Sequence, residues 1–397
     1  MTFKRGNLEK QIPNLPQEVK FCKKCIISNQ RPRAVFDEDG ICSGCRNTDY
    51  KNNKIDWKKR EEELVELLDK HRRNDSTWDV VVPSSGGKDS AYVAHQLKHR
   101  YGMHPLLVTW TPLLYTDIGF QNFQALRDSG FTVLSAYPNG KLHRKLARLS
   151  LEELGDAFHV FVLGQLFYPF HMALKMNIGL VFYGENGEVE YAGDPKGVDM
   201  PFRSPESWTH NVLKGCTFQE LIEYGLRNKD YFSKDDFQDS DLLFYQSPPL
   251  EKLLEADLKV YYYSYYHKWN PQENYYYATE HTGFKPNNER SEGTFSKYSS
   301  LDDKLDGMHY FMRYIKFGLG RCIEDACQEI RSGHITRDEG VALVNRYDGE
   351  FPAKYFNDFL VYLGITEEYF WEIADSYRLP HIWQKNNNQW KLKNPTI

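Results

Sequence analysis

One glycine-rich segment of the 397-residue chain has the residue types needed to bind phosphate, Pro83-Ser-Ser-Gly-Gly-Lys-Asp-Ser90. Its glycines let backbone N–H groups approach a phosphate closely, and its serines can donate hydroxyl hydrogen bonds. Lys88 supplies positive charge, and Asp89 supplies a carboxylate of the kind that holds Mg²⁺. The segment predicts an ATP-phosphate site with Lys88 and Asp89 in catalytic roles, formed by Ser84, Ser85, Gly86, Gly87, Lys88, Asp89 and Ser90. The alternative is an ordinary serine-glycine turn capped by Asp89.

Two regular elements must position this loop. The β-branched run 78–82 predicts a buried strand before it, and residues 91–98 predict a helix after it. A loop between a strand and a helix N-terminus presents N–H groups and a favourable dipole to an anion. The Walker A spacing cannot be drawn through the segment, so a P-loop of that type is excluded.

Residues 85–90 resemble the SGGxDS signature of the PP-loop ATP pyrophosphatases. This resemblance implies a doubly wound parallel α/β domain of the adenine nucleotide alpha hydrolase type, with ATP and Mg²⁺ as cofactors. It also implies a reaction in which a substrate oxygen is adenylated, pyrophosphate leaves, and a nitrogen or sulfur nucleophile displaces AMP.

Further strands and helices fit such a domain. Strands are expected at 105–110, 131–135 and 178–183, with helices at 121–129 and, as one long stretch, at 142–175. Ligands of doubly wound sheets bind beyond the C-terminal ends of the strands. This rule places Thr109, Trp110 and Asn122 beside adenosine, with core packing as the alternative for Trp110.

The segment Gly184-Glu-Asn-Gly-Glu188 follows the last of these strands. We interpret Gly184 as an ATP contact, and Glu185 and Asn186 as catalytic groups that accept or relay protons. A plain hairpin turn is the alternative.

Four cysteines near the N-terminus have metal-ligand spacing: Cys22, Cys25, Cys42 and Cys45 form two CxxC pairs separated by sixteen residues. This pattern predicts a tetrahedral structural zinc in a small, zinc-ribbon-like module at residues 1–52. Within this N-terminal part, the polar segment 46–54 is interpreted as a linker. Unrelated thiols or a redox-active pair are the alternatives. The other cysteines, Cys216, Cys322 and Cys327, are expected to be buried hydrophobes.

Charge is distributed unevenly around the net value of −5. Residues 1–60 hold 14 Lys/Arg and 7 Asp/Glu, and the remaining residues hold 36 and 48. Because residues 61–397 carry a net negative charge, we do not expect the protein to bind nucleic acid. No run of 18 apolar residues occurs, and no apolar stretch follows the basic start, so we expect no membrane span and no export signal. With seven cysteines, a reducing cytoplasm is the expected location.

A narrower resemblance follows from several segments together. The cysteine pairs, the loop and residues 183–188, 269–274, 289–298 and 333–342 are similar to the N-acetyl sugar amidotransferases of bacterial O-antigen and pseudaminic-acid-type pathways. The resemblance implies that an acetamido group of a nucleotide-activated diacetamido sugar becomes an acetamidino group, through an O-adenylated imidate attacked by ammonia. It implies ammonia from a separate HisH-like glutaminase, in some members with a HisF-like subunit.

The cationic amidine product would be complemented by acidic groups, with Glu185 as first choice and Asp194 and Asp199 behind it. Arg290 and Lys297 are expected to close over the triphosphate, with a solvated loop as the alternative. For the tyrosine-rich stretch 261–277 we favour packing over a stacking wall for sugar or base. Asp302 and Asp303 are interpreted as helix caps rather than metal ligands.

Three regions are therefore predicted: the cysteine module at 1–52, the ATP pyrophosphatase domain at 53–285 and a mainly helical C-terminal region at 286–397. One competing function is that of a PP-loop enzyme that thiolates tRNA or otherwise modifies nucleobases. The absence of cysteine between Cys45 and Cys216 argues against it. A zinc-dependent interaction protein with a degenerate ATP site is the other, and the intact loop argues against that.

Overall fold

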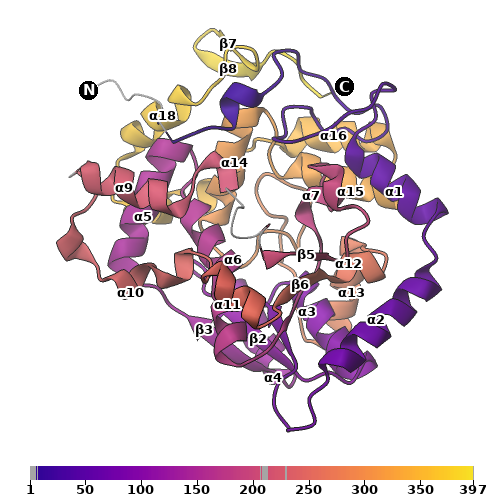
Figure 1. Ribbon diagram of the computed structural model, residues 1–397. Helices are drawn as coiled ribbons and strands as arrows, with labels where there is room; N and C mark the ends of the chain where they lie inside the picture. Colours follow the sequence, from indigo (N-terminus) through magenta and orange to yellow (C-terminus); the bar gives the residue numbers. More distant parts are fainter. Residues whose placement is uncertain (1–5, 7, 206, 208–212, 229, 397) are drawn as a thin grey trace.

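A computed structural model describes residues 6, 8–205, 207, 213–228 and 230–396. Its centre is a six-stranded sheet of order β3-β2-β1-β4-β6-β5 (Figure 1). The strands are β1 Val80–Pro83, β2 Pro105–Trp110, β3 Thr132–Ala136, β4 Leu180–Tyr183, β5 Phe202–Arg203 and β6 Lys259–Tyr262. All neighbours are parallel except β5 and β6. The predicted α/β fold is confirmed, but the sheet is mostly rather than wholly parallel because β5 is antiparallel. The four predicted strands are present with ends shifted by at most two residues, and β5 and β6 were not predicted.

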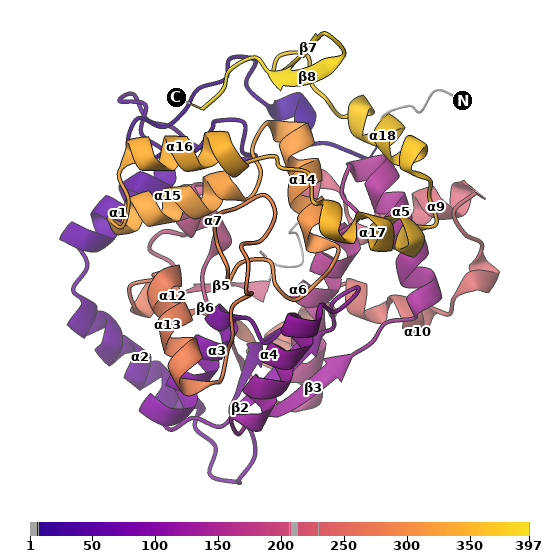
Figure 2. The ribbon, with the colours of Figure 1, turned by 180° about the vertical axis from the view of Figure 1, so that it is seen from behind.

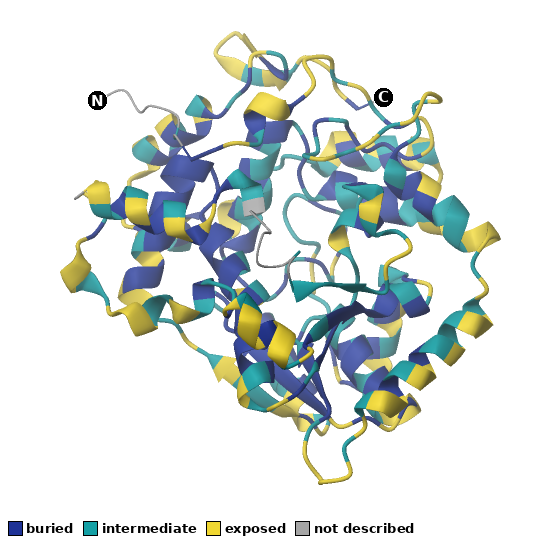
Figure 3. Cartoon of the chain, viewed as in Figure 1, coloured by how far each residue is buried: buried dark blue, intermediate teal, exposed yellow. Residues whose placement is uncertain are grey.

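Helices cover both faces of the sheet because its strands are apolar on both sides. Val80 and Val82 pack with α2 Trp57–His71, α3 Lys88–His95, α4 Asp117–Asp128 and α13 Pro271–His281. Val81, between them, packs on the other face with α5 Gly140–Leu154 and α6 His159–Lys175. Figure 3 shows the strands as a buried centre, whereas outer helices such as α2 alternate buried and exposed residues.

The long helix predicted at 142–175 is wrong in one respect, since the chain turns sharply within it. Gly155 ends α5 with φ +67°, and α5 and α6 are bent by 120°. Asp156 then accepts a hydrogen bond from the Phe158 backbone N–H at 2.9 Å, just before α6 begins. Within the described residues, no single helix has the length and apolarity of a membrane span; only this bent pair, taken together, passes that test.

The C-terminal region is helical, as predicted, and ends in a hairpin. It contains α14 Asp306–Phe317, α15 Cys322–Ser332, α16 Arg337–Tyr347, α17 Phe356–Leu363, α18 Glu367–Ser376, β7 Trp383–Asn386 and β8 Gln389–Leu392 (Figure 2). Thr336 and Thr366 cap the N-termini of α16 and α18. No helix begins at Asp302 or Asp303, because Ser300 has φ +56° and the next helix begins only at Asp306.

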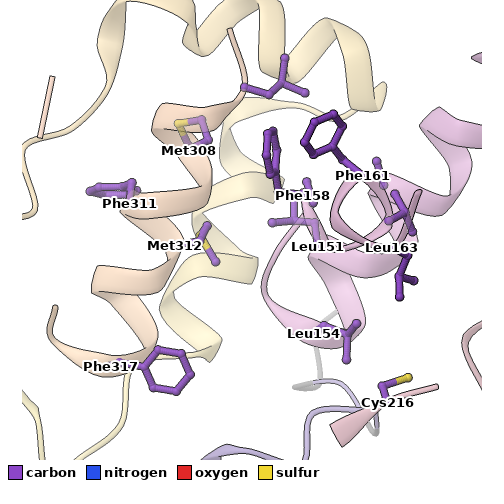
Figure 4. Packing of buried hydrophobic residues seen from close by; sticks show 14 of the residues in the cluster. Leu151, Leu154, Phe158, Phe161, Leu163, Cys216, Met308, Phe311, Met312 and Phe317 are labelled. Carbon is purple, nitrogen blue, oxygen red and sulfur yellow. The ribbon is translucent and has the colours of Figure 1, made fainter. Parts of the chain in front are cut away.

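The C-terminal helices share one core with the α5–α6 corner. Figure 4 shows Met308 and Met312 of α14 facing Leu151 and Phe158, all within one cluster of buried side chains. α14 is therefore anchored to the helices that cover one face of the sheet.

The predicted linker at 46–54 is instead helical. α1 spans Ser43–Asn53, and the Cys42 side chain accepts from the backbone N–H of Cys45 at its N-terminus. Because this segment is polar and only weakly amphipathic, its sequence shows no hydrophobic periodicity that would indicate a helix. Further short helices in the described residues are α7 Gly187–Glu190, α9 Phe218–Arg227, α10 Asp239–Leu242, α11 Leu250–Glu255 and α12 Tyr263–Tyr266. A π-helical turn, Gln96–Arg100, follows α3. Turns of 3₁₀ helix occur at Ile12–Asn14, Pro195–Gly197, Leu213–Gly215, Lys234–Asp236, Leu243–Tyr245 and Ala353–Tyr355.

Candidate active site and metal centre

The glycine-rich loop lies where the order of the sheet reverses. β2 and β3 lie to one side of β1, and β4 and β6 lie to the other. Val81 of β1 pairs with Val181 of β4, so the loops that follow these two strands emerge side by side. This position is where doubly wound sheets bind ligands. It brings Lys88 and Asp89 close to Glu185.

The loop conformation depends on Gly86. Its φ is +90°, and a Cβ at this position would lie 2.6 Å from the Phe123 Cα. Ser84 accepts a hydrogen bond from the Gly86 N–H at 3.3 Å and contacts the Ser90 hydroxyl at 2.9 Å. Thr109 donates to the Ser84 carbonyl at 2.5 Å and is almost fully buried. Thr109 therefore supports the loop from behind.

A small pocket of about 150 Å³ opens in front of the loop. Loop residues and several distant segments line it: Ser85, Gly86, Gly87, Lys88, Asp89, Gly119, Asn122, Phe284, Tyr298, Ser299, Ser300, Leu301, Asp302 and Arg321. Loop glycines, two carboxylates and two cations in one concave site suit a phosphate with a divalent cation.

The two charged loop residues are held in place by neighbours. Lys88 is mostly buried, and its Nζ lies 2.5 Å from Asp89 Oδ2 and 5.3 Å from the centre of the Tyr298 ring. Asp89 Oδ1 accepts a hydrogen bond from Asn274 at 2.9 Å. Asn274 is buried in α13, so this helix sets the orientation of Asp89.

Glu185 is poised to exchange protons near neutral pH. Burial raises its pKa to about 7, and the charge of Asp89 contributes in the same direction against the opposing charge of Lys88. The Tyr191 hydroxyl donates to Glu185 Oε1 at 3.3 Å. A carboxyl group with this pKa can act as a general acid or base.

The position of Trp110 differs from its predicted role as an ATP contact. Its ring packs against Tyr245 and against Gly164, where a Cβ would lie 2.1 Å from the indole. Side chains alternate along a strand, so Thr109 and Trp110 point to opposite faces. The packing alternative is correct for Trp110.

Other predicted residues serve local structure. Asn186 accepts from the Glu188 N–H at 3.2 Å and caps α7, and Asp194 accepts from Lys196 at 3.0 Å. Asp199 accepts from the Tyr50 hydroxyl at 2.7 Å. Glu190, which interacts with Lys51, is the acid that raises the pKa of Glu185 after Asp89.

Gly184 allows an aromatic side chain to approach the end of β4. A Cβ at Gly184 would lie 2.6 Å from the Trp269 ring. Trp269 and Tyr263 are buried in the cluster around Phe182, which confirms packing for this part of the tyrosine-rich stretch.

The 285–298 segment reaches the pocket differently from the prediction. Asn122 lines the pocket but bonds the backbone of Lys285, accepting at 2.8 Å and donating at 2.9 Å. Arg290 forms two bonds to Glu350, at 2.6 and 2.7 Å, in a neighbouring cavity. Lys297 donates to the Asn288 carbonyl at 2.9 Å. The structure does not bring Arg290 or Lys297 among the residues that line the loop pocket.

Arg321 is the pocket cation that sequence reasoning missed. It stands at the start of α15, where it donates to Asp325 at 2.9 Å and to the Tyr310 hydroxyl at 2.6 Å. Asp302 also lines the pocket, and a hydrogen bond with Ser85 opposes the rise in its pKa caused by burial. Asp303 accepts backbone N–H groups, including that of Leu305 at 2.8 Å. The helix-cap prediction is therefore wrong for both residues: α14 has Leu305 as its N-cap, Asp303 binds backbone N–H groups just before it, and Asp302 lines the pocket.

The four N-terminal cysteines converge on one point. All four are buried, and their sulfur atoms lie within 4.8 Å of one another. Cys22 and Cys45 sulfurs are 3.9 Å apart, and those of Cys25 and Cys42 are 3.6 Å apart. A tetrahedral zinc with Zn–S bonds of about 2.3 Å requires sulfurs roughly 3.8 Å apart. Within the described part of the chain, this is the one His, Cys, Asp and Glu group with metal-site spacing.

The surroundings of the cysteines suit thiolates. The Cys42 N–H donates to Cys22 Sγ at 3.2 Å, and the Cys45 N–H donates to Cys42 Sγ at 3.4 Å. The thiolate charges raise the pKa of Arg331 on α15 against its burial. A cluster with four sulfurs, N–H donors and a buried cation is compatible with a structural zinc.

Residues 292–395 match the family model described as "LPS biosynthesis protein WbpG-like, C-terminal domain". The match relates this region to lipopolysaccharide biosynthesis. No curated protein matched the chain.

The matched region contributes directly to the pocket. Tyr298, Asp302 and Arg321 come from it, whereas the loop and Glu185 lie in segments that follow strands β1 and β4. Neither part alone completes the site.

Proposed function

We propose that the protein is an ATP-dependent, AMP-forming amidotransferase of lipopolysaccharide O-antigen or related glycan biosynthesis. Its substrate would be a nucleotide-activated N-acetyl sugar, whose acetamido group becomes an acetamidino group. The observation that carries the proposal is the placement of Glu185, with a pKa near 7, beside the Lys88–Asp89 pair at the switch point of the sheet. The lipopolysaccharide match of residues 292–395 supports the pathway.

The loop would bind the phosphates of ATP. Backbone N–H groups at Gly86 and Gly87 and the start of α3 would stabilise the negative charge of the phosphates, and the positive charges of Lys88 and Arg321 would stabilise it further. Asp89 and Asp302 line the same pocket and provide a donor set that fits Mg²⁺. When bound, Mg²⁺ would offset charge on the departing pyrophosphate.

The reaction has two displacements. The acetamido oxygen attacks the α-phosphorus, an oxygen–phosphorus bond forms, and the bond to pyrophosphate breaks. Ammonia then adds to the imidate carbon, and the carbon–oxygen bond breaks as AMP leaves with that oxygen. Glu185 would accept a proton from the added ammonia, because its pKa lies near neutrality. The cationic amidine left behind would lie beside the carboxylate pair Glu185 and Asp89.

The cysteine cluster would hold a structural zinc, since four protein ligands leave no open position. Ammonia would come from a separate HisH-like glutaminase, with a HisF-like subunit as a further partner. These assignments rest on the resemblance, and the cluster geometry supports the zinc.

The test is turnover with ATP, Mg²⁺, ammonium and nucleotide-activated diacetamido sugars, followed by mass spectrometry. AMP and a sugar in which NH replaces O are expected. A substrate labelled with heavy oxygen in the acetamido group should transfer the label to AMP. ADP as product, or unlabelled AMP, would overturn the mechanism, and salt-sensitive binding of tRNA with sulfur transfer would favour a nucleobase-modifying enzyme.

A further inference from the structure

Lys51 reaches the segment that carries Glu185 from the cysteine module. It lies on α1, the helix that also contains Cys45, and α1 packs against α7 (Figure 1). Its ammonium group contacts the carboxylate of Glu190 and donates a hydrogen bond to the Ser264 carbonyl at 3.2 Å. One lysine of the module thereby binds both α7 and α12, which lie far from it in the sequence.

Both contacts lead to Glu185. The Ser264 N–H donates to the carbonyl of Gly184, the residue before Glu185, at 2.8 Å. Glu190 follows Glu185 at the end of α7, and its charge contributes to the raised pKa of Glu185, so the two carboxyl groups are near each other. Lys51 is therefore connected to the chain on both sides of Glu185.

The pair of Lys51 and Glu190 is buried, with side chains only 12% and 10% exposed. A carboxylate at this depth needs a counter-charge nearby, because burial removes its hydration. Lys88, the cation whose charge acts on Glu185, is already paired with Asp89. Lys51 supplies the counter-charge to Glu190.

Other contacts between the module and this segment are more peripheral. Arg33 pairs with Glu188 at 2.5 Å, but its side chain is 49% exposed, and ion pairs with such exposure contribute little. The Ser43 hydroxyl donates to the Gly193 carbonyl at 2.9 Å, beyond the end of α7. Lys51 is thus the cation of the module that is best placed to fix the backbone around Glu185.

We propose that Lys51 is a positioning residue of the candidate active site: by binding Glu190 and the Ser264 carbonyl together, it holds the Glu185 carboxyl group in place beside the glycine-rich loop. The inference rests on the proposed function, because it serves the residue to which that reaction assigns a proton transfer. Lys51 is not among the residues that line the loop pocket, so it acts through Glu185 rather than on ATP. The cysteine module would then take part in the reaction as well as hold a metal.

Steady-state kinetics of AMP formation by the zinc-loaded full chain test the proposal. Lys51→Met keeps the length of the side chain but removes its charge and both bonds, whereas Lys51→Arg keeps the charge. The matched control is Lys54→Met, at an exposed lysine that forms the C-cap of the same helix. The double variant Lys51→Met with Glu190→Gln leaves no buried carboxylate without a partner, so it separates positioning from stability.

Lys51→Met should lower kcat roughly tenfold with an unchanged KM for ATP, because a small displacement of a reacting group slows the chemical step. Lys51→Arg should recover most of kcat, and Lys54→Met should match the wild type. The double variant should recover the unfolding temperature that Lys51→Met loses, but not kcat. Recovery of kcat together with the unfolding temperature, or equal kcat in Lys51→Met and wild type, would overturn the positioning role.

Hydrogen exchange followed by mass spectrometry gives a readout that needs no turnover. Peptides covering residues 184–191 should exchange faster in Lys51→Met than in the wild type or Lys54→Met. If they do so while no diacetamido sugar yields AMP, the amidotransferase is rejected and the positioning role stands. If amidine forms and Lys51→Met changes neither exchange nor kcat, the positioning role is rejected and the reaction stands.

Discussion

Glu185 and Asp89 lie in segments that follow two adjacent parallel strands, and the negative charge of Asp89 adds to burial in raising the pKa of Glu185 to about 7. Lys88 lies against Asp89 and limits that rise. ATP binding would change this balance, because phosphates and a divalent cation would enter the same pocket. The proton affinity of Glu185 is thus linked to the occupancy of the loop.

Replacing Glu185 tests its role as a base. Glu185→Gln should lower kcat by roughly 10²–10⁴-fold, the range for loss of a general base. In the wild type, the deprotonated fraction of Glu185 grows as pH rises through about 7, so kcat should rise over the same interval at constant free ammonia. The pH profile of the variant should lose this rise. A profile that keeps it would assign the titration to another group.

Gly86 should be intolerant of any side chain. Its φ of +90° and the predicted 2.6 Å approach of a Cβ to Phe123 mean that Gly86→Ala strains the loop. We expect a loss of stability of about 1–3 kcal/mol and loss of AMP formation. The control is Gly140→Ala at the start of α5, where nothing lies within 4 Å of a Cβ. Denaturant unfolding of both variants compares them directly, and equal stability of the two would refute the strain argument.

Asn274 should act through Asp89. Asn274→Ala removes the 2.9 Å hydrogen bond to Asp89 Oδ1, so the carboxylate loses its orientation. We expect kcat/KM for ATP to fall roughly tenfold, with more Mg²⁺ needed for half-maximal rate. Thr279→Ala on the same helix, which removes only a local bond to the Tyr275 carbonyl, is the control. An unchanged Mg²⁺ dependence would show that Asn274 is merely structural.

The cysteine cluster should contain one zinc per chain. Cys45→Ser should reduce zinc content and lower the unfolding temperature, because metal binding contributes folding free energy. Cys216→Ser, at a buried cysteine outside the cluster, should keep the metal. Elemental analysis of purified protein measures both. Full zinc content in Cys45→Ser would exclude the proposed ligand set.

Arg331 should stabilise the metal-bound cluster by charge. Its pKa is raised by the cysteine thiolates, which shows that the cation and the thiolates interact favourably. Arg331→Met should leave zinc stoichiometry unchanged but speed zinc release to a chelator roughly tenfold. Arg337→Met, which removes a 3.2 Å bond to the Cys25 carbonyl, is a neighbouring control. Equal release rates from Arg331→Met and wild type would contradict this role.

Local patterns predicted the elements that depend on neighbouring residues. The glycine loop with its flanking strand and helix, and the cysteine pairs, are each encoded within a short segment. The structure has the strand and the helix on either side of the loop, and it brings the four cysteines together, as expected. Trp110 was misassigned because the strand end marks where ligands bind but not which face a side chain joins. The turn at Gly155 was missed because apolar residues continue through it on both sides.

Arg321 and Asn274 could not be found in this way. Arg321 is more than 200 residues from the loop, and its position depends on how α14 and α15 pack against the α5–α6 corner. Asn274 meets Asp89 only because α13 lies against α3. Such contacts are products of tertiary packing, and a single sequence contains no local signal for them.

Helix α15 connects the loop pocket with the cysteine cluster. Arg321 at its first end lines the loop pocket, and Arg331 near its last turn lies beside the cysteine sulfurs, about 15 Å away at the rise of an α-helix. Release of the metal would loosen the C-terminal end of α15 and displace Arg321 at its N-terminal end. If the loop pocket binds ATP as proposed, chains without the metal should bind it more weakly than metal-loaded chains.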